Sequence, residues 1–188
     1  MSKYKAVQNK INKIIIPSVR KLKDLEYALQ CKSPFILLSE IHIGNLKEFT
    51  SLCHTKDKLV LVNIDLVGGL SKDSTGIKFL KTLYKVDGIM SPNPIFINMA
   101  KDLEMICIHR FFMIDSKSFE SGMKALENSN CDAVEILPSP MAADYFQVIK
   151  EQKNVPILAG GFIKSVQMIK ELFELGIDGV TTSNKNFW

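Results

Sequence analysis

The sequence has no long hydrophobic run and little of what builds disulfide frameworks or metal centres. Its apolar runs fall far short of the roughly 20 residues that cross a bilayer, and the stretch from Met1 to Lys13 is too polar for a signal peptide. The four cysteines are widely spaced without a paired-ligand pattern, which favours reduced structural thiols. We therefore expect a soluble, cytoplasmic protein that binds neither a membrane nor a metal.

Signals of catalysis and of known RNA-binding modules are also scarce. No apolar run contains a lysine beyond Lys13, which begins the first, so a Schiff-base nucleophile is missing. The histidines follow no metal-ligand spacing, and neither an aromatic RNA-recognition motif nor an arginine-rich tract occurs. The net charge of +4 is compatible with a phosphorylated ligand or a nucleic acid and selects neither. We expect no enzyme activity and no cofactor.

What the chain does contain is a regular alternation of short apolar runs and amphipathic stretches. The runs have the composition of buried parallel strands and span 13–16, 35–38, 59–65, 88–90, 105–112, 133–137, 156–159 and 179–182. Helical periodicity between them predicts covering helices. The pattern predicts an α/β fold: one short-looped (β/α) TIM-type barrel of eight parallel strands over residues 1–188. A doubly wound open sheet is the alternative, which the even spacing disfavours.

The predicted barrel lacks its final outer helix. Only residues 183–188 follow the eighth run, although each strand of such a barrel is normally followed by a helix. We expect the gap beside the eighth strand to be covered either by the N-terminal segment 2–12 or by a second copy of the chain in a homodimer.

Two runs near the C-terminus end in small or hydroxyl residues. One ends in Gly160 and Gly161, the other in Thr182, Ser183 and Asn184, and one helix length separates them. In (β/α)-barrels the loops after strands seven and eight commonly hold a phosphate through backbone N–H groups. We therefore predict that these five residues bind the phosphate of a small ligand.

Charged residues at the ends of other runs predict the rest of the site. Because side chains alternate along a strand, Glu40, Asp65, Arg110 and Glu135 are expected to point into the mouth of the barrel. Buried charges need partners, so these groups either contact a ligand or only plug the barrel top. His42, in the loop after Glu40, is either a further ligand contact or a solvated histidine. We predict all five as rim residues of the ligand site.

Several motifs occur in a fixed order along nearly the whole chain. They are EIHIG at 40–44, LVNIDLVGGL at 61–70, DGIMS at 87–91, IHRFFMID at 108–115, VEILP at 134–138, LAGGFI at 158–163 and TTSN at 181–184, followed by Trp188. In this order and spacing, the set resembles the glycerol uptake operon antiterminator family.

The resemblance implies a compact barrel that acts as a regulator. Members of the family, with glycerol 3-phosphate bound, act on the leader mRNA of glycerol-metabolism genes and let transcription pass a terminator. The implied partners are therefore a leader mRNA and a small phosphorylated effector. The residues implied for the phosphate are Gly160, Gly161, Thr182 and Ser183, and those for the polyol end are Asp65, Arg110 and Glu135.

Three single positions and one three-residue segment depart from the family pattern. Asn63 stands where a histidine is usual, His109 replaces a glutamine, Ser139 replaces a glycine, and Pro92-Asn-Pro94 replaces a threonine and a basic stretch. The prolines remove hydrogen-bond donors and a positive charge from the rim. This change leaves open a ligand-binding relative that no longer binds RNA.

Two further alternatives stay open on the sequence alone. A barrel isomerase or lyase could act on a small phosphorylated metabolite with Asp65 or Glu135 as its base. Lysines near both ends of the chain, among them Lys3, Lys164 and Lys185, form a diffuse basic surface. That surface either binds RNA phosphates or is an ordinary solvated face.

Overall fold

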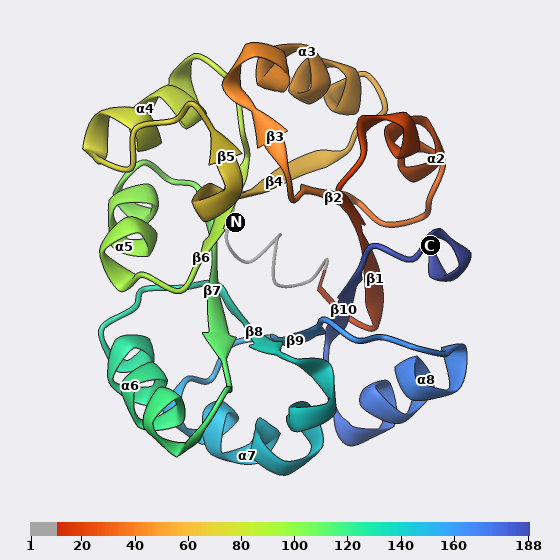
Figure 1. The fold of residues 1–188 in the computed structure, drawn as a ribbon, viewed down its shortest axis with the longest axis vertical. Helices are drawn as coiled ribbons and strands as arrows, with labels where there is room; N and C mark the ends of the chain where they lie inside the picture. The colour runs from red at the N-terminus through yellow and green to blue at the C-terminus, as the bar shows by residue number, and fades with distance from the viewer. Residues whose placement is uncertain (1–10) are drawn as a thin grey trace.

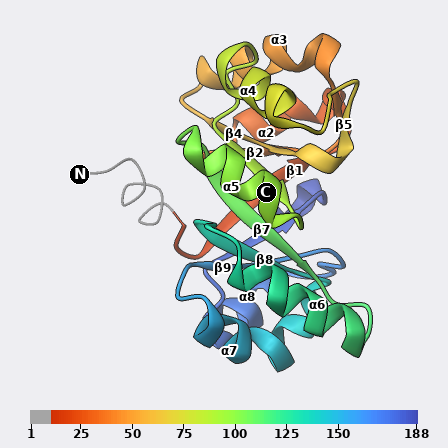
Figure 2. The same cartoon turned by 90° about the vertical axis from the view of Figure 1, so that its left-hand side faces the viewer.

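The computed structural model describes residues 11–188, which form a closed barrel of parallel strands surrounded by helices (Figure 1). The strand order is β1-β10-β9-β8-β7-β6-β4-β2, so the last barrel strand pairs with the first. Seen from the side, the helices pack around the strands (Figure 2). The predicted TIM-type barrel is confirmed and the open sheet is excluded.

The elements follow the alternation expected from the sequence. The barrel strands are β1 (Ile14–Val19), β2 (Phe35–Leu38), β4 (Leu59–Asn63), β6 (Gly88–Ser91), β7 (Ile106–Phe112), β8 (Ala133–Leu137), β9 (Ile157–Gly160) and β10 (Gly179–Thr182). The outer helices are α2 (Leu25–Leu29), α3 (Ile43–His54), α4 (Ser74–Thr82), α5 (Pro94–Asp102), α6 (Ser116–Glu127), α7 (Ala142–Gln152) and α8 (Val166–Leu175). Short 3-10 helices are η1 (Leu22–Asp24), η2 (Ile64–Leu66), η3 (Ser139–Met141) and η4 (Lys185–Phe187).

Two strand boundaries differ from the prediction, and both matter for the site. β1 continues to Val19, whereas the apolar run ends at Ile16, because Pro17 and Ser18 still pair with neighbouring strands. β4 ends at Asn63, where the chain turns into η2. Arg20 therefore stands directly at the end of a strand, and Asp65 does not lie on one.

Alternating side chains divide the strands between two apolar regions. Phe35 and Leu37 belong to a buried cluster that fills the inside of the barrel. Ile36 and Leu38 belong to the larger cluster between the strands and the helices. This alternation is what buried strands require when both faces are covered. The inner cluster fills the barrel below its mouth, and among residues 11–188 the polar residues that line the mouth cavity lie at or just beyond the carboxyl ends of the strands.

Side chains and a glycine cap the helix ends. The Asp115 carboxylate accepts a hydrogen bond from the Ser118 N–H at the start of α6, in a capping box. Ser165 caps α8, because its Oγ accepts a hydrogen bond from the Met168 N–H. Gly176, with φ of +107°, ends α8 in the left-handed conformation. The caps at Asp115 and Ser165 mark where the loops after β7 and β9 end at the barrel mouth.

The loops after β2 and β4 form a small sheet that the sequence did not predict. β3 (Ile41–His42) and β5 (Val67–Gly68) pair in parallel, with Ile41 opposite Val67. Both of these apolar residues are buried against the main core. The sheet lies over one side of the barrel mouth (Figure 1).

Among the described residues, β10 is followed by η4 and by no α-helix. The indole Nε1 of Trp188 donates a hydrogen bond to the Thr182 carbonyl at 2.8 Å, and the Trp188 ring lies 6.0 Å from that of Tyr27 in α2. Lys185 forms an ion pair with Asp24 at 3.0 Å. These contacts fill part of the space beside β10. Nearly all of the predicted N-terminal cover, 2–12, lies outside the described residues, and a homodimer stays a prediction.

Candidate functional site

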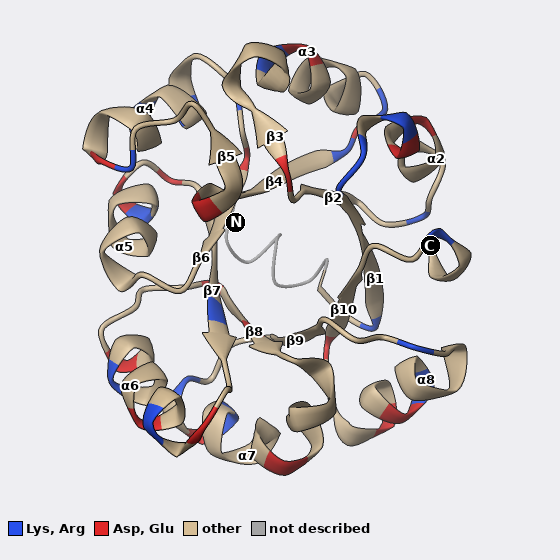
Figure 3. Ribbon diagram, viewed as in Figure 1, with Lys and Arg blue, Asp and Glu red and all other residues tan. Residues whose placement is uncertain are grey.

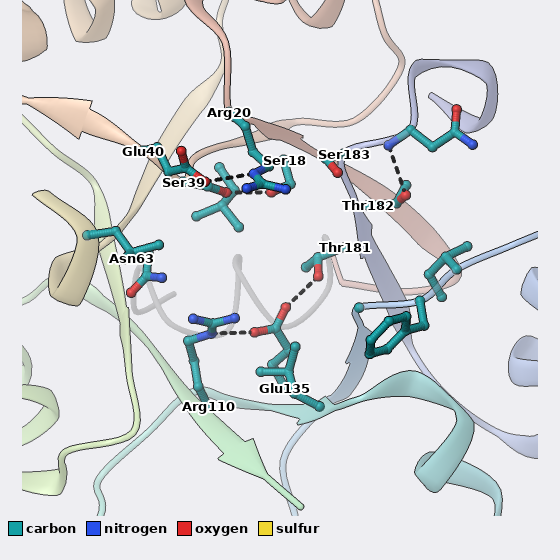
Figure 4. A pocket seen from close by; sticks show the side chains of 17 residues that line it. Ser18, Arg20, Ser39, Glu40, Asn63, Arg110, Glu135, Thr181, Thr182 and Ser183 are labelled. Carbon is teal, nitrogen blue, oxygen red and sulfur yellow. Dashed lines mark hydrogen bonds and ion pairs between the residues drawn. The ribbon is translucent and has the colours of Figure 1, made fainter. Parts of the chain in front are cut away.

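The carboxyl ends of the strands surround a cavity of about 360 Å³ at the barrel mouth (Figure 4). Strands β1, β2, β4, β7, β8 and β10 contribute to its wall, together with the loops after β2, β9 and β10. The polar lining residues are Ser18, Arg20, Ser39, Glu40, Asn63, Arg110, Glu135, Thr181, Thr182, Ser183 and Asn184, beside Gly161. A concave site of this size with several converging polar groups is typical of small-ligand sites.

The floor of the cavity holds a buried ion pair. Arg110 Nε donates to Glu135 Oε2 at 2.8 Å, and the two residues are register partners on β7 and β8. Thr181 Oγ1 donates to the other Glu135 oxygen. The Arg110 and Glu135 side chains are 17% and 1% exposed, respectively. The Glu135 charge is thus compensated on both oxygens, as a buried carboxylate requires.

Arg110 has a second partner, since its guanidinium lies 4.8 Å from the centre of the Phe112 ring. Such a cation–π contact holds the planar group in one orientation while leaving N–H donors available. Arg110 and Glu135 both line the cavity, as predicted from the alternation on their strands. Their contact with a ligand stays a prediction.

Gly160 lies beneath this ion pair and not in the cavity wall. It is the last residue of β9 and is buried. A Cβ atom at this position would lie 2.6 Å from Glu135 Oε1 and would clash with Thr181 Oγ1. Gly160 therefore provides the room in which Glu135 and Thr181 meet. Gly160 does not line the cavity, so the lining does not support the phosphate contact predicted for it, which stays a prediction.

The loop after β9 is held in an unusual conformation. Gly161 and Phe162 have φ of +73° and +56°, so two successive residues are left-handed, which is rare for a bulky residue such as phenylalanine. Ser139 fixes this loop, because both its N–H and its hydroxyl donate to the Gly161 carbonyl, at 3.2 and 2.6 Å. Phe162 lines the cavity although its side chain is 70% exposed.

The loop after β10 forms the adjacent wall. Thr182 Oγ1 accepts from the Asn184 N–H at 3.1 Å, and Asn184 Oδ1 accepts from the Asn186 N–H at 3.1 Å. Ser183 also lines the cavity (Figure 4). Four of the five residues predicted for the phosphate, all except Gly160, therefore line the same cavity. Their phosphate-binding role stays a prediction.

A second arginine–glutamate pair stands on the opposite wall. Arg20 Nε donates to Glu40 Oε1 at 2.7 Å, and the side chains are 61% and 47% exposed. Beneath them the hydroxyls of Ser18 and Ser39 form a hydrogen bond. Sequence reasoning missed Arg20 as a site residue because it placed the end of β1 too early. An arginine directly after a barrel strand is itself a sign of a site residue, and Arg20 directly follows β1.

Glu40 reaches the cavity, but not by the alternation that we used to predict it. Leu38 packs toward the helices, so the inward residues of this segment are Leu37 and Ser39. β2 ends at Leu38, and Glu40 lies in the loop before β3. Its side chain is positioned by Arg20 rather than by the pleat of a strand.

His42 and Asp65 do not line the cavity. His42 Nδ1 accepts from the Gly44 N–H at 3.1 Å and caps α3, and its ring lies against Gly68. Asp65 lies in η2, where its carboxylate accepts a hydrogen bond from the Ser91 hydroxyl at 3.2 Å. The alternation rule fails for Asp65 because β4 ends at Asn63, which itself lines the cavity.

Two features of other barrel sites are not found among residues 11–188. Among residues 11–188, no group of histidine, cysteine, aspartate and glutamate side chains is arranged to hold a metal ion. None of the described barrel strands contains a lysine. A search of the described helices finds none with the length and apolar character of a membrane span.

Comparison with known proteins agrees with the fold and the motif order. The sequence profile of the family described as glycerol-3-phosphate responsive antiterminator matches residues 15–188. A glycerol uptake operon antiterminator regulatory protein from Listeria monocytogenes str. 4b F2365 is 33% identical, with a TM-score of 0.88 over 94% of this chain and 95% of that one. A glycerol uptake operon antiterminator-related protein from Thermotoga maritima MSB8 is 26% identical, with a TM-score of 0.83 over 94% and 98%.

One further relative and one structural neighbour of low identity extend the comparison. The protein YgcP of Escherichia coli strain K12 is 28% identical over 174 residues, which cover 93% of this chain and 91% of that protein. A 2,3-dimethylmalate lyase has a TM-score of 0.70 at 12% identity, which shows a shared barrel and no shared activity. Because the family profile spans nearly the whole chain, including every cavity residue, this protein belongs to the glycerol-3-phosphate responsive antiterminator family.

Proposed function

We propose that this protein is a cytoplasmic, glycerol 3-phosphate-responsive, RNA-binding transcription antiterminator that acts on the leader mRNA of glycerol-metabolism genes. The observation that carries the proposal is the family match over residues 15–188, which contain every residue of the mouth cavity. The effector binds in this cavity, and no cofactor or catalytic step is needed. The RNA binds elsewhere on the surface, and the affinity of the protein for RNA changes when the effector binds.

The cavity offers separate surfaces for the two ends of such an effector. The loops that carry Gly161 and Ser183 follow β9 and β10, the position at which barrels of this type commonly bind phosphate. The Arg110–Glu135 pair on the floor supplies charged donors and acceptors for hydroxyl groups. A small polyol phosphate therefore binds with its hydroxyls inward and its phosphate at the rim.

Ligand binding regulates the protein by ordering the loops after β9 and β10. The left-handed Gly161 and Phe162 give this region a conformation that a bound anion stabilises. Changing an RNA-competent state from about 1% to 99% of the population needs roughly 5.5 kcal/mol of preferential binding. Charge-assisted hydrogen bonds to a phosphate supply a large part of that energy.

The RNA-binding surface is less sharply defined than the cavity. Figure 3 shows basic and acidic residues intermixed around the helices, with basic segments beside α2 and between β9 and α8. The second of these contains Lys164, next to the ligand loop, whereas Lys185 is already paired with Asp24. If such lysines contact single-stranded RNA, log affinity falls with log salt by a slope of about 0.7 per phosphate contacted.

The competing functions receive less support from the geometry. A barrel isomerase or lyase with Asp65 as its base lacks that base in the cavity. Both oxygens of the Glu135 carboxylate are already held in hydrogen bonds within the protein, one by Arg110 and one by Thr181. The Pro92-Asn-Pro94 departure lies outside the cavity lining, where Asn93 and Pro94 begin α5. This segment therefore contributes no group to the cavity wall.

Calorimetric titration tests the effector step. We expect glycerol 3-phosphate to bind to the wild-type protein and glycerol to bind at least tenfold more weakly, because glycerol lacks the charge-assisted contacts. Gly161→Asp should abolish binding, since it places a carboxylate in the phosphate loop, while Gly161→Ala controls for the left-handed backbone. An affinity of Gly161→Asp equal to that of Gly161→Ala would show that the phosphate lies elsewhere.

Transcription through a glycerol-operon leader tests the regulatory step. With the purified protein, read-through of the terminator should rise on addition of glycerol 3-phosphate and should not rise with Gly161→Asp. Effector binding without any change in read-through would support the alternative in which the RNA function is lost.

A further inference from the structure

We propose that Arg20 is the cation that binds the phosphate of the effector, and that Glu40 is the counter-ion from which Arg20 separates when the effector enters. This inference rests on the proposed function, and it assigns the phosphate end of the site to a residue outside the β9 and β10 loops. It also gives Glu40, which the sequence predicted as a rim residue of the ligand site, the role of a counter-ion.

The register of the barrel brings Arg20 to the phosphate loops. β1 pairs with β10 through Pro17 and Thr182, so the residues that follow these strands leave the sheet side by side. Arg20 and Ser183 accordingly line the mouth cavity together, and both also line a second hollow beside it. Arg20 thus stands next to Ser183 on the rim, at the same end of the barrel as Gly161.

The two arginines of the cavity differ in what they have available for a ligand. The Arg110 guanidinium lies between Glu135 and Phe112 and is mostly buried. The Arg20 side chain is 61% exposed and has its Nε on Glu40. A guanidinium carries five N–H donors in a fork that fits two oxygens of one phosphate. Arg20 can therefore bind a phosphate in bidentate fashion without disturbing the buried pair.

Charge balance favours opening of the Arg20–Glu40 pair. Within the described part of the chain, the cavity is lined by two arginines and two glutamates, whose formal charges cancel. A phosphate monoester brings about −1.5 to −2 charges at neutral pH, and next to a paired Arg20 it would also meet the Glu40 carboxylate. An exposed ion pair contributes little free energy, so exchanging carboxylate for phosphate costs little. The Glu40 side chain is 47% exposed and can turn into solvent.

The inference predicts opposite effects for the two members of the pair. Arg20→Ala should weaken binding of glycerol 3-phosphate by about tenfold to a hundredfold, because a charged hydrogen-bond donor is lost. Glu40→Gln should strengthen binding by several-fold, because it frees Arg20 and removes a repulsive charge. The affinity of Arg20→Lys for glycerol 3-phosphate should lie between those of Arg20→Ala and wild type, since lysine keeps the charge but not the bidentate fork.

The test is calorimetry of glycerol 3-phosphate, glycerol and inorganic phosphate on the wild type and these variants. Lys23→Ala is the matched control. Lys23 lies three positions after Arg20, carries the same charge and does not line the cavity. Thermal melts should show all variants folded. We expect Arg20→Ala to weaken the binding of glycerol 3-phosphate and of inorganic phosphate and to leave the affinity for glycerol unchanged.

The possible failures are distinguishable. If wild type binds glycerol 3-phosphate and Arg20→Ala binds it within twofold of Lys23→Ala, the Arg20 inference is overturned and the proposed function stands. If wild type binds inorganic phosphate but shows no preference for glycerol 3-phosphate, the proposed function fails while the effect of Arg20→Ala still decides the role of Arg20. If wild type binds none of these ligands, both are overturned.

Discussion

Two arginine–glutamate pairs face each other across the mouth of the barrel, and they differ in burial far more than in geometry. The joining N···O distances are 2.7 Å for Arg20–Glu40 and 2.8 Å for Arg110–Glu135. The first pair is about half exposed, whereas Glu135 is 1% exposed. Burial decides what each pair can do. The inner pair cannot separate without leaving a desolvated charge, while the outer pair can exchange partners with a ligand.

The largest expected effect comes from breaking the inner pair. Arg110→Ala should lower the free energy of unfolding by about 3–5 kcal/mol, because it leaves the Glu135 carboxylate buried and unpaired. Chemical denaturation measures this loss. The double variant Arg110→Ala with Glu135→Gln should recover part of it, since the buried charge is gone. No recovery in the double variant would mean that packing rather than charge dominates at this position.

His109, on the face of β7 opposite Arg110, makes the free energy of unfolding depend on pH. His109 neighbours Arg110 but points away from the cavity, hydrogen bonded to Ser129, and burial lowers its pKa from 6.5 to about 4. The unfolded chain therefore binds more protons between these pH values, and the His109 contribution to stability falls as pH drops from about 6.5 to about 4. The total change is on the order of 3 kcal/mol.

The variant His109→Gln provides the comparison, because it removes this titration and keeps a hydrogen-bonding side chain. Free energies of unfolding measured from pH 7 to pH 4 should fall more steeply for wild type than for His109→Gln. Parallel curves would contradict the assignment of a lowered pKa to His109 and would attribute the acid sensitivity to the carboxylates.

A smaller loss is expected from crowding the inner pair without removing it. Gly160→Ala puts a methyl group 2.6 Å from Glu135 Oε1 and against Thr181, which should cost about 1–3 kcal/mol of stability as an overpacked site. Gly161→Ala is the control, because a Cβ there meets only ordinary contacts and its cost comes from φ of +73°. Thermal unfolding of the two variants should separate crowding from backbone strain. Equal stability of Gly160→Ala and wild type would contradict the role assigned to Gly160.

The smallest effect on stability belongs to the outer pair. Arg20→Ala and Glu40→Gln should each change the free energy of unfolding by less than about 1 kcal/mol, as expected for exposed ion pairs. Denaturant titration of both variants checks this. A loss comparable to that of Arg110→Ala would show that the outer pair is structural and is not poised for exchange.

How far the sequence predicted the site depends on whether a residue lies within a strand or just beyond its end. Arg110 and Glu135 were found because they lie within β7 and β8, where side-chain alternation holds to the end of the strand. Asp65 was misplaced because the strand pattern of 59–65 continues past Asn63 while the backbone turns into η2. Arg20 was missed because Pro17 interrupts the apolar run of β1 without ending the strand. Alternation therefore predicts residues on strands and fails one or two positions beyond them.

The fold was more predictable than the site for a related physical reason. Buried parallel strands require continuous apolar runs, and these stand out in the sequence. The sheet of β3 and β5 escaped prediction because each of its strands has only two residues. The role of Gly160 depends on Thr181 and Glu135, which lie far from it in sequence and meet it only in the barrel. Such contacts are fixed by register and not by local pattern.

The coupling of the cavity to RNA is the central claim, and one measurement tests it most directly. The affinity of the wild-type protein for a glycerol-operon leader RNA should be measured by fluorescence anisotropy at one fixed salt concentration, with and without saturating glycerol 3-phosphate. We predict an increase of at least tenfold with the effector, and no increase in Gly161→Asp. Equal affinities of the wild type with and without bound effector would contradict the claim that this cavity controls an RNA-binding antiterminator.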